Sequence, residues 1–223
     1  MTYILSIETA TKNCSVSLSL NGDTISTREV SEEGYSHAEK LHVFIEEVLK
    51  EVQIDFSKLS AVAVSQGPGS YTGLRIGVSA AKGICYALNI PLIAIDTLEV
   101  LARKLSIDKG VIVPMIDARR MECYTAVFSS DFVLKREIKS EIITEDSFSD
   151  IDEIIHFVGD GAAKCKEVLK DKKFVYHDDS IFPSSKQMGA LAFEKYKKSD
   201  TVNVAYFEPF YLKDFMITTS SAK

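Results

Sequence analysis

The feature that most constrains the fold of this chain is a pattern of strands that occurs twice. In the first half, a predicted strand over residues 3–7 ends at Glu8, and two further strands follow after short turns. In the second half, a predicted strand over residues 111–116 ends at Asp117 and is again followed by a turn, a strand, a turn and a strand. A plan that repeats within one chain indicates an internally duplicated fold.

A second unit supports the duplication. A short buried strand, a glycine-containing loop and a helix span residues 61–88, and a similar strand, glycine and helix follow residue 155. No linker rich in glycine or serine separates the halves, so we expect two lobes packed face to face. The predicted fold is α/β, with lobes over residues 1–103 and 104–223. The C-terminal residues of the smaller second lobe are expected to pack back on the first.

Local signals define the elements of the first lobe. Polar and apolar residues alternate over residues 14–20, and Asn21-Gly22-Asp23 predicts a hairpin turn before the next strand. We expect a three-stranded antiparallel meander with one buried face. A helix is predicted over residues 36–52, because residues 36–39 have the form of a capping box and apolar residues recur at helical spacing. A second helix is predicted over residues 73–88.

Composition excludes some classes of protein. The 223 residues are 46% hydrophobic and 26% charged, which is typical of a chain with a packed core. The formal net charge is −6, and a protein that binds duplex nucleic acid alone needs a cationic surface for the phosphates. We therefore expect a partner to hold any nucleic acid that this protein handles.

The cysteines and the apolar runs indicate where the protein works. Its four cysteines contain no CxxC pair, so we interpret them as buried thiols in a reducing compartment. The N-terminal residues lack the pattern of a secretory signal, and no apolar run approaches the length of a membrane span. These observations predict a cytoplasmic protein without a membrane partner.

The sharpest local motif is a glycine loop between a buried strand and a helix. Loops of this kind present backbone N–H groups and a helix dipole to anions. This one fits neither the Walker pattern nor the dinucleotide fingerprint. It is interpreted either as a tight turn with an N-cap from Ser70 or Thr72, or as a phosphate-binding loop. The phosphate-binding residues would be Gly67, Pro68, Gly69, Ser70, Thr72 and Arg75.

The helix after this loop has one narrow polar stripe, and the rest of its circumference is apolar or small. A helix with this pattern is buried on two sides. One side can pack on its own sheet, and the other can pack within the chain or against a partner; the sequence leaves both readings open. The polar stripe contains Arg75, Ser79, Lys82, Tyr86 and Asn89.

Acidic and histidine residues do not assemble into a complete catalytic set. Glu8 and Asp117 follow strands, where carboxylates either cap turns or hold magnesium. His37 and His42 are five residues apart and project from different helix faces, so they make a poor metal pair. His156 is expected in the core and His177 in solvent. No metal site and no catalytic residue is predicted.

Four segments resemble the TsaB (YeaZ) family. They are GPGSYTGLRIG at 67–77, ILSIETA at 4–10, YSHAEKL at 35–41 and IDARR at 116–120. The resemblance covers the chain from end to end. It implies a two-lobed fold of the actin/Hsp70/sugar-kinase (ASKHA) superfamily with duplicated RNase H-like cores. This chain departs from the family at one position, since it has Glu8 where Asp is more common in the family.

The resemblance also implies a function. TsaB proteins support the TsaD paralogue, which transfers threonylcarbamoyl from threonylcarbamoyl-AMP to N6 of adenosine 37 in tRNAs that read ANN codons. We therefore expect a non-catalytic scaffold subunit that forms a heterodimer with TsaD and a homodimer when alone. The ATPase TsaE would join the complex, and the chain would meet tRNA only through that complex. No cofactor is firmly predicted, and any ATP or ADP with magnesium would bind at a subunit interface of the complex.

Two sets of residues follow from this hypothesis. The partner interface is predicted on the two helices of the first lobe, at His37, Leu41, Phe44, Gly73, Gly77, Ala80, Ala81 and Ile84. A vestigial cleft between the lobes would contain Glu8, Asp117, Arg119 and Arg120. The alternative hypothesis is an autonomous ATP-dependent kinase or acyl-phosphate enzyme, which would use Glu8, Asp117 and the glycine loop.

Overall fold

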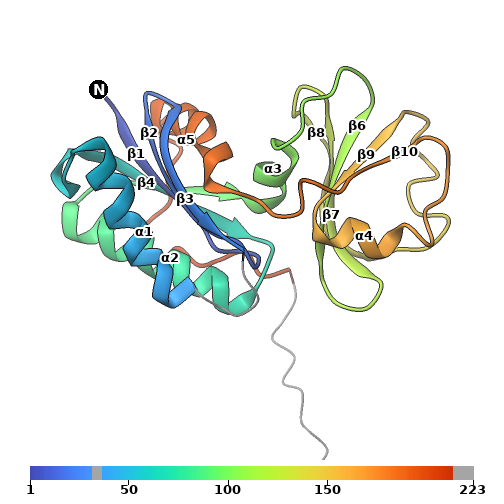
Figure 1. Ribbon diagram of the computed structural model, residues 1–223, viewed down its shortest axis with the longest axis horizontal. Helices are drawn as coiled ribbons and strands as arrows, with labels where there is room; N and C mark the ends of the chain where they lie inside the picture. The colour runs from blue at the N-terminus through green and yellow to red at the C-terminus, as the bar shows by residue number, and fades with distance from the viewer. Residues whose placement is uncertain (32–36, 213–223) are drawn as a thin grey trace, which may run out of the picture.

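A computed structural model describes residues 1–31 and 37–212. Two lobes lie side by side, each built on one five-stranded sheet (Figure 1). The first sheet has the order β3-β2-β1-β4-β5, and the second has the order β10-β9-β6-β7-β8. In reverse, the second order is β8-β7-β6-β9-β10. Across each sheet, the strands of the lobe therefore lie in the order third, second, first, fourth and fifth. The predicted duplication is therefore confirmed.

Each sheet combines an antiparallel meander with two parallel strands. In the first lobe, β1 (Tyr3–Glu8), β2 (Cys14–Leu20) and β3 (Asp23–Val30) form the meander, and β4 (Leu59–Gly67) and β5 (Leu92–Asp96) continue it in parallel. In the second lobe, the equivalent strands are β6 (Val111–Asp117), β7 (Glu122–Ser129), β8 (Leu134–Ile142), β9 (Ile155–Val158) and β10 (Phe174–His177). Glu8 and Asp117 end the matching strands β1 and β6.

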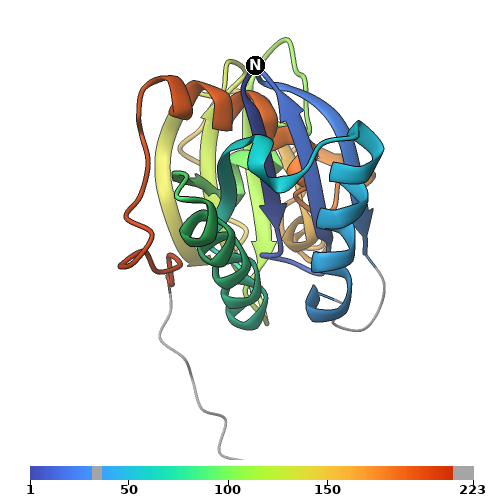
Figure 2. The same cartoon turned by 90° about the vertical axis from the view of Figure 1, so that its left-hand side faces the viewer.

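Helices cover the sheets unequally. The long helices α1 (His37–Val52) and α2 (Tyr71–Leu88) lie side by side on one face of the first sheet, as Figure 2 shows. The opposite face is covered by α5 (Met188–Lys197) and the 3-10 turn η2 (Ser185–Gln187). The remaining elements are α3 (Thr97–Ala102), α4 (Asp160–Cys165) and the 3-10 turn η1 (Phe56–Lys58). The two-lobed ASKHA-like fold is thus present.

The expectation that only one face of the meander is buried is wrong. Ser15, Ser17 and Ser19 alternate with apolar residues on β2 but are completely buried. The Ser15 hydroxyl lies 2.7 Å from the hydroxyl of Ser185, and the Ser17 hydroxyl donates to the Ser185 carbonyl over 2.8 Å. Ser15 and Ser17 thus bond to a segment that returns to the first sheet after the second lobe is complete, whereas the Ser19 hydroxyl donates to the Ile4 carbonyl over 3.3 Å.

Two helices cross the boundary expected from the sequence. α3 precedes residue 103, yet Leu98, Leu101 and Ala102 pack with residues of the second sheet. α5 follows the second lobe, yet Met188 and Ala192 pack on the first sheet. Each half of the chain therefore contributes a helix to the other half's core, and the two lobes are joined by packing as well as by chain connection.

The cysteines agree with the sequence analysis, since all four are buried free thiols. The environment of His177 differs from the solvent exposure that the sequence predicted. It is partly buried on β10, and its Nε2 lies 2.9 Å from Nδ1 of His156 on the neighbouring strand. Among the described residues, no helix combines the length and the apolar character that crossing a membrane requires.

Candidate functional site

Helix α1 is built to pack on the first sheet along one stripe. Leu41, Ile45, Val48 and Leu49 recur at helical spacing and are buried there. His37 is buried as well, and its Nε2 lies 2.8 Å from the Thr11 carbonyl oxygen. The capping box predicted at the start of this helix involves Ser36, which lies outside the described residues. The outer face of α1 carries Ala38, His42 and Val43 into solvent.

Helix α2 begins and ends with well-defined caps. The Ser70 hydroxyl accepts a hydrogen bond from Gly73 N–H over 3.3 Å, and Asn89 ends the helix in the left-handed conformation. The predicted N-cap at Ser70 is therefore confirmed. The inward stripe of α2 approaches the sheet closely: a Cβ atom on Gly73 would lie 2.1 Å from the Thr9 carbonyl oxygen. One on Gly77 would lie 2.3 Å from the Thr9 hydroxyl.

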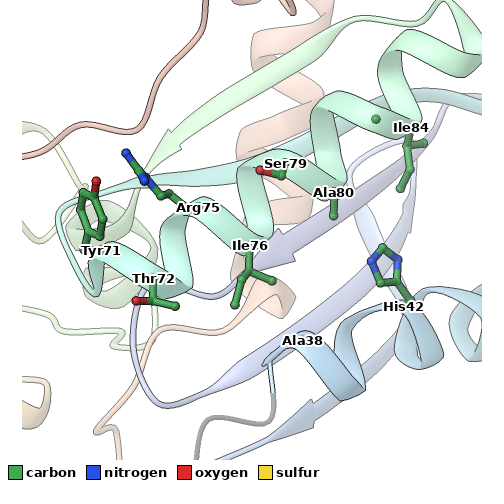
Figure 3. A pocket seen from close by; sticks show the side chains of 10 residues that line it. Ala38, His42, Tyr71, Thr72, Arg75, Ile76, Ser79, Ala80 and Ile84 are labelled. Carbon is green, nitrogen blue, oxygen red and sulfur yellow. The ribbon is translucent and has the colours of Figure 1, made fainter.

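An apolar groove runs between the outer faces of the two helices (Figure 3). Ile76, Ala80 and Ile84 project from α2 toward α1, where His42 faces them. The groove has a volume of about 800 Å³, and a Cβ atom on Gly83 would meet nothing within 4 Å. Its lining consists of Ala38, His42, Tyr71, Thr72, Arg75, Ile76, Ser79, Ala80, Gly83 and Ile84. Exposed apolar surface of this kind is typical of a protein–protein contact.

The structure corrects the residues predicted for the partner interface. His37, Leu41, Gly73, Gly77 and Ala81 are buried within the lobe and are not available to a partner. Ala80 and Ile84 do line the groove, while Phe44 is half-buried and packs beside the first core. A helical pattern shows that small residues share a helix, but it does not say which of them contact the sheet.

The groove ends at a cluster of aromatic and cationic side chains. The Arg75 guanidinium carbon lies 4.2 Å from the centre of the Tyr71 ring. Nε of Arg75 donates to the hydroxyl of Tyr211 over 3.2 Å, and the rings of Tyr71 and Tyr211 are 5.0 Å apart. Tyr211 is 136 residues from Arg75 in the chain. Sequence spacing gave no signal for this contact.

The glycine loop is occupied by protein contacts. Ser70 N–H donates to the Ala10 carbonyl over 2.6 Å, and Gly67 N–H donates to the Thr97 hydroxyl over 3.2 Å. Gly67 and Pro68, joined by a cis peptide, are buried, and Gly69 is half-buried. Only Thr72 and Arg75 of the predicted phosphate-binding set are exposed. Two of the donors that would hold a phosphate are therefore already used within the lobe.

Glu8 lies in the core of the first lobe. It is fully buried, accepts a hydrogen bond from the Ser65 hydroxyl, and accepts another from Ala10 N–H over 2.7 Å. Burial raises the pKa of the Glu8 carboxyl to about 7, although the bonds from Ser65 and Ala10 act in the opposite direction. A carboxyl whose charged form is disfavoured by burial and that is closed off from solvent is a poor ligand for magnesium.

Asp117 has a different environment from Glu8. It is exposed and forms an ion pair with Lys164, whose ammonium also donates to the Glu122 carbonyl over 2.7 Å. Arg119 and Arg120 occupy the turn after β6 and are exposed. None of the ion pairs among the described residues joins these arginines to Glu8. Within residues 1–31 and 37–212, no cluster of three metal-ligating side chains exists.

Comparison with known proteins gives consistent matches. The family model described as TsaD, tRNA N6-adenosine threonylcarbamoyltransferase, matches residues 31–217. The Escherichia coli K12 protein named tRNA threonylcarbamoyladenosine biosynthesis protein TsaB is 28% identical over an alignment that covers 95% of this chain and 94% of that protein. A tRNA N6-adenosine threonylcarbamoyltransferase of Halalkalibacterium halodurans is 38% identical over an alignment that covers 41% of this chain and 31% of that protein.

A solved structure agrees with the fold. YeaZ from Pseudomonas aeruginosa superposes with a TM-score of 0.84, at 24% identity, over 95% of this chain and 100% of that one. At this level of identity the likeness concerns the fold alone. The shorter match to the transferase covers less than half of this chain, whereas the TsaB and YeaZ matches cover nearly all of it.

Proposed function

The chain belongs to the TsaB/YeaZ family, and we propose that it is a non-catalytic subunit for the biosynthesis of threonylcarbamoyladenosine in tRNA. Its partner is a TsaD-type transferase, which moves threonylcarbamoyl from threonylcarbamoyl-AMP to N6 of adenosine 37 in tRNAs that read ANN codons. The chain supports this partner by binding it. The ATPase TsaE joins the heterodimer, and the same surface forms a homodimer when the partner is absent.

The observation that carries the binding role is the exposed groove between α1 and α2. Its centre is apolar, and its two walls are parallel stretches of helix that a second helix pair can meet (Figure 3). Tyr86 of α2, which is 85% exposed, extends the exposed apolar surface beyond the groove. Helices that present small residues such as Ala80 and Gly83 allow a close approach of the partner backbone. A four-helix contact is the arrangement that this surface fits.

The proposed contact is tested by the substitution Gly83→Arg. Because a side chain at this position points into open space, we expect the variant to fold normally. It should weaken association with the organism's own TsaD at least about a hundredfold, because an unpaired charge would be buried in the contact. Analytical ultracentrifugation measures both the heterodimer and the homodimer, and circular dichroism verifies the fold.

Ala163→Arg is the matched control, because Ala163 is exposed on α4 in the other lobe. This variant should bind like the wild type. A folded Gly83→Arg protein that still forms both complexes at micromolar concentration would show that the partner binds elsewhere.

The alternative of an autonomous kinase or acyl-phosphate enzyme is less favoured by the site. Glu8 is buried and the loop donors at Gly67 and Ser70 are used, so this chain alone does not fit ATP with magnesium. Such a nucleotide would need residues from a partner. We expect the isolated chain with ATP and magnesium to turn over far more slowly than about 1 per second, the low end of ordinary enzymes. A steady-state phosphate-release assay measures this, and a rate at or above that value would favour the alternative.

A further inference from the structure

Arg75 is held in a fixed place at the end of the groove. Its guanidinium stacks on Tyr71, and its Nε–H is bonded to Tyr211 on the segment that returns from the second lobe. Contact with two aromatic side chains restricts the rotation of a long, otherwise flexible side chain. Arg75 is therefore oriented before any partner arrives.

The restraint on Arg75 leaves part of the guanidinium available. Nε is used by Tyr211, and among the described residues no carboxylate lies within ion-pair distance of the two terminal nitrogens. The hydrogen bond with Tyr211 raises the pKa of Arg75, and the nearby charge of Glu208 acts in the same direction. Arg75 thus remains a cation with outward-facing donors.

The other basic group on this helix is already occupied. Lys82 donates to the carbonyl oxygens of Phe207 over 2.9 Å and Ala205 over 3.1 Å, so it fastens the returning segment to α2. Within the described part of the groove lining, Arg75 is the one lysine or arginine. The groove therefore combines an apolar centre with a single oriented cation at one end.

We propose that Arg75 is the charged anchor of the partner surface and takes a carboxylate from the partner protein, with Tyr211 acting as its positioning residue. This inference rests on the proposed function, because it names the chemistry of the partner that the groove binds. An arginine whose two terminal nitrogens have no hydrogen-bond acceptor among residues 1–31 and 37–212 matches a carboxylate in a bidentate geometry. A solitary cation beside an apolar groove suits a protein contact better than RNA, which requires several cations along its phosphates.

The test is the affinity of the wild type, three variants and one control variant for the purified partner at several salt concentrations. Arg75→Gln should weaken binding about 10- to 100-fold and reduce the salt dependence of the affinity. Tyr211→Phe keeps the ring but removes the acceptor for Nε, and should weaken binding about 3- to 10-fold. Glu208→Gln should strengthen binding by about 2- to 5-fold, because it removes a nearby negative charge that would repel the carboxylate of the partner. A purely structural role for these residues would not give effects of opposite sign.

Arg119→Gln is the matched control, since Arg119 is an exposed arginine of the second lobe. It should change neither the affinity nor its salt dependence. If Arg75→Gln binds the partner as tightly as the wild type does, the inference is overturned and the proposed function stands. If the wild type itself does not bind the partner, both the proposed function and the inference are overturned. If the isolated chain binds tRNA and Arg75→Gln abolishes that binding, Arg75 contacts RNA phosphate, and the inference is also overturned.

Discussion

Replacing Glu8 by glutamine is expected to raise the free energy of unfolding at pH 8 by about 3 kcal/mol. The pKa of this carboxyl rises from 4.5 to about 7 on folding because the side chain is buried. The folded chain therefore binds more protons than the unfolded chain between these values, and wild-type stability falls as the pH rises through this window. Glutamine is neutral throughout, and its amide can bond to Ser65 while its oxygen accepts from Ala10 N–H.

Urea denaturation of both proteins between pH 4.5 and pH 8 measures this effect. The wild type should lose stability across the window while Glu8→Gln stays nearly constant, so that the difference grows with pH. Glu145→Gln, a change at an exposed glutamate, should show no such trend. A Glu8→Gln protein that is less stable than the wild type at pH 8 would mean that the carboxylate is the preferred form of Glu8 in the fold.

Two glycines of α2 should respond in opposite directions to the same substitution. Gly73→Ala should destabilise the fold by about 2–3 kcal/mol, because the added methyl would overlap the Thr9 backbone and push α2 away from the sheet. Gly83→Ala should stabilise it by about 0.5–1 kcal/mol, because alanine favours a helix and the site is open. Thermal or chemical unfolding of the two variants gives this comparison directly.

The opposite signs test the orientation of α2. If both changes stabilised the protein, the helix would not contact the strand end at Thr9. If both destabilised it by similar amounts, Gly83 would be buried, and the groove between α1 and α2 would be closed.

The sequence was sufficient to predict elements whose signals are local. The repeated strand, acidic residue and turn at Glu8 and Asp117 predicted the duplication, and the apolar spacing predicted helices that the structure places at α1 and α2. The N-cap at Ser70 was also predictable, because a cap depends on residues within one turn of the helix.

Contacts between distant segments could not be predicted in this way. The serines of β2 had the pattern of an exposed face, but Ser185, about 170 residues later in the chain, bonds to Ser15 and Ser17. Small residues on α2 were assigned together to one interface, although Gly73 and Gly77 face Thr9 whereas Ala80 lines the groove. Tyr211 was not predicted at the site, because its contact with Arg75 depends on how the chain returns across the first lobe.

The return of residues 184–211 to the first lobe has a consequence for synthesis on the ribosome. The strands of the first sheet are translated early, but α5 is translated only after the whole second lobe. Its contacts with Ile4, Ala63 and Ile93 can therefore form only then. Until then, one face of the nascent sheet lacks its cover, and the groove lacks Tyr211 beside Arg75. The proposed partner surface is therefore completed by some of the last described residues to leave the ribosome. An incompletely translated chain would present this surface without its charged anchor in position.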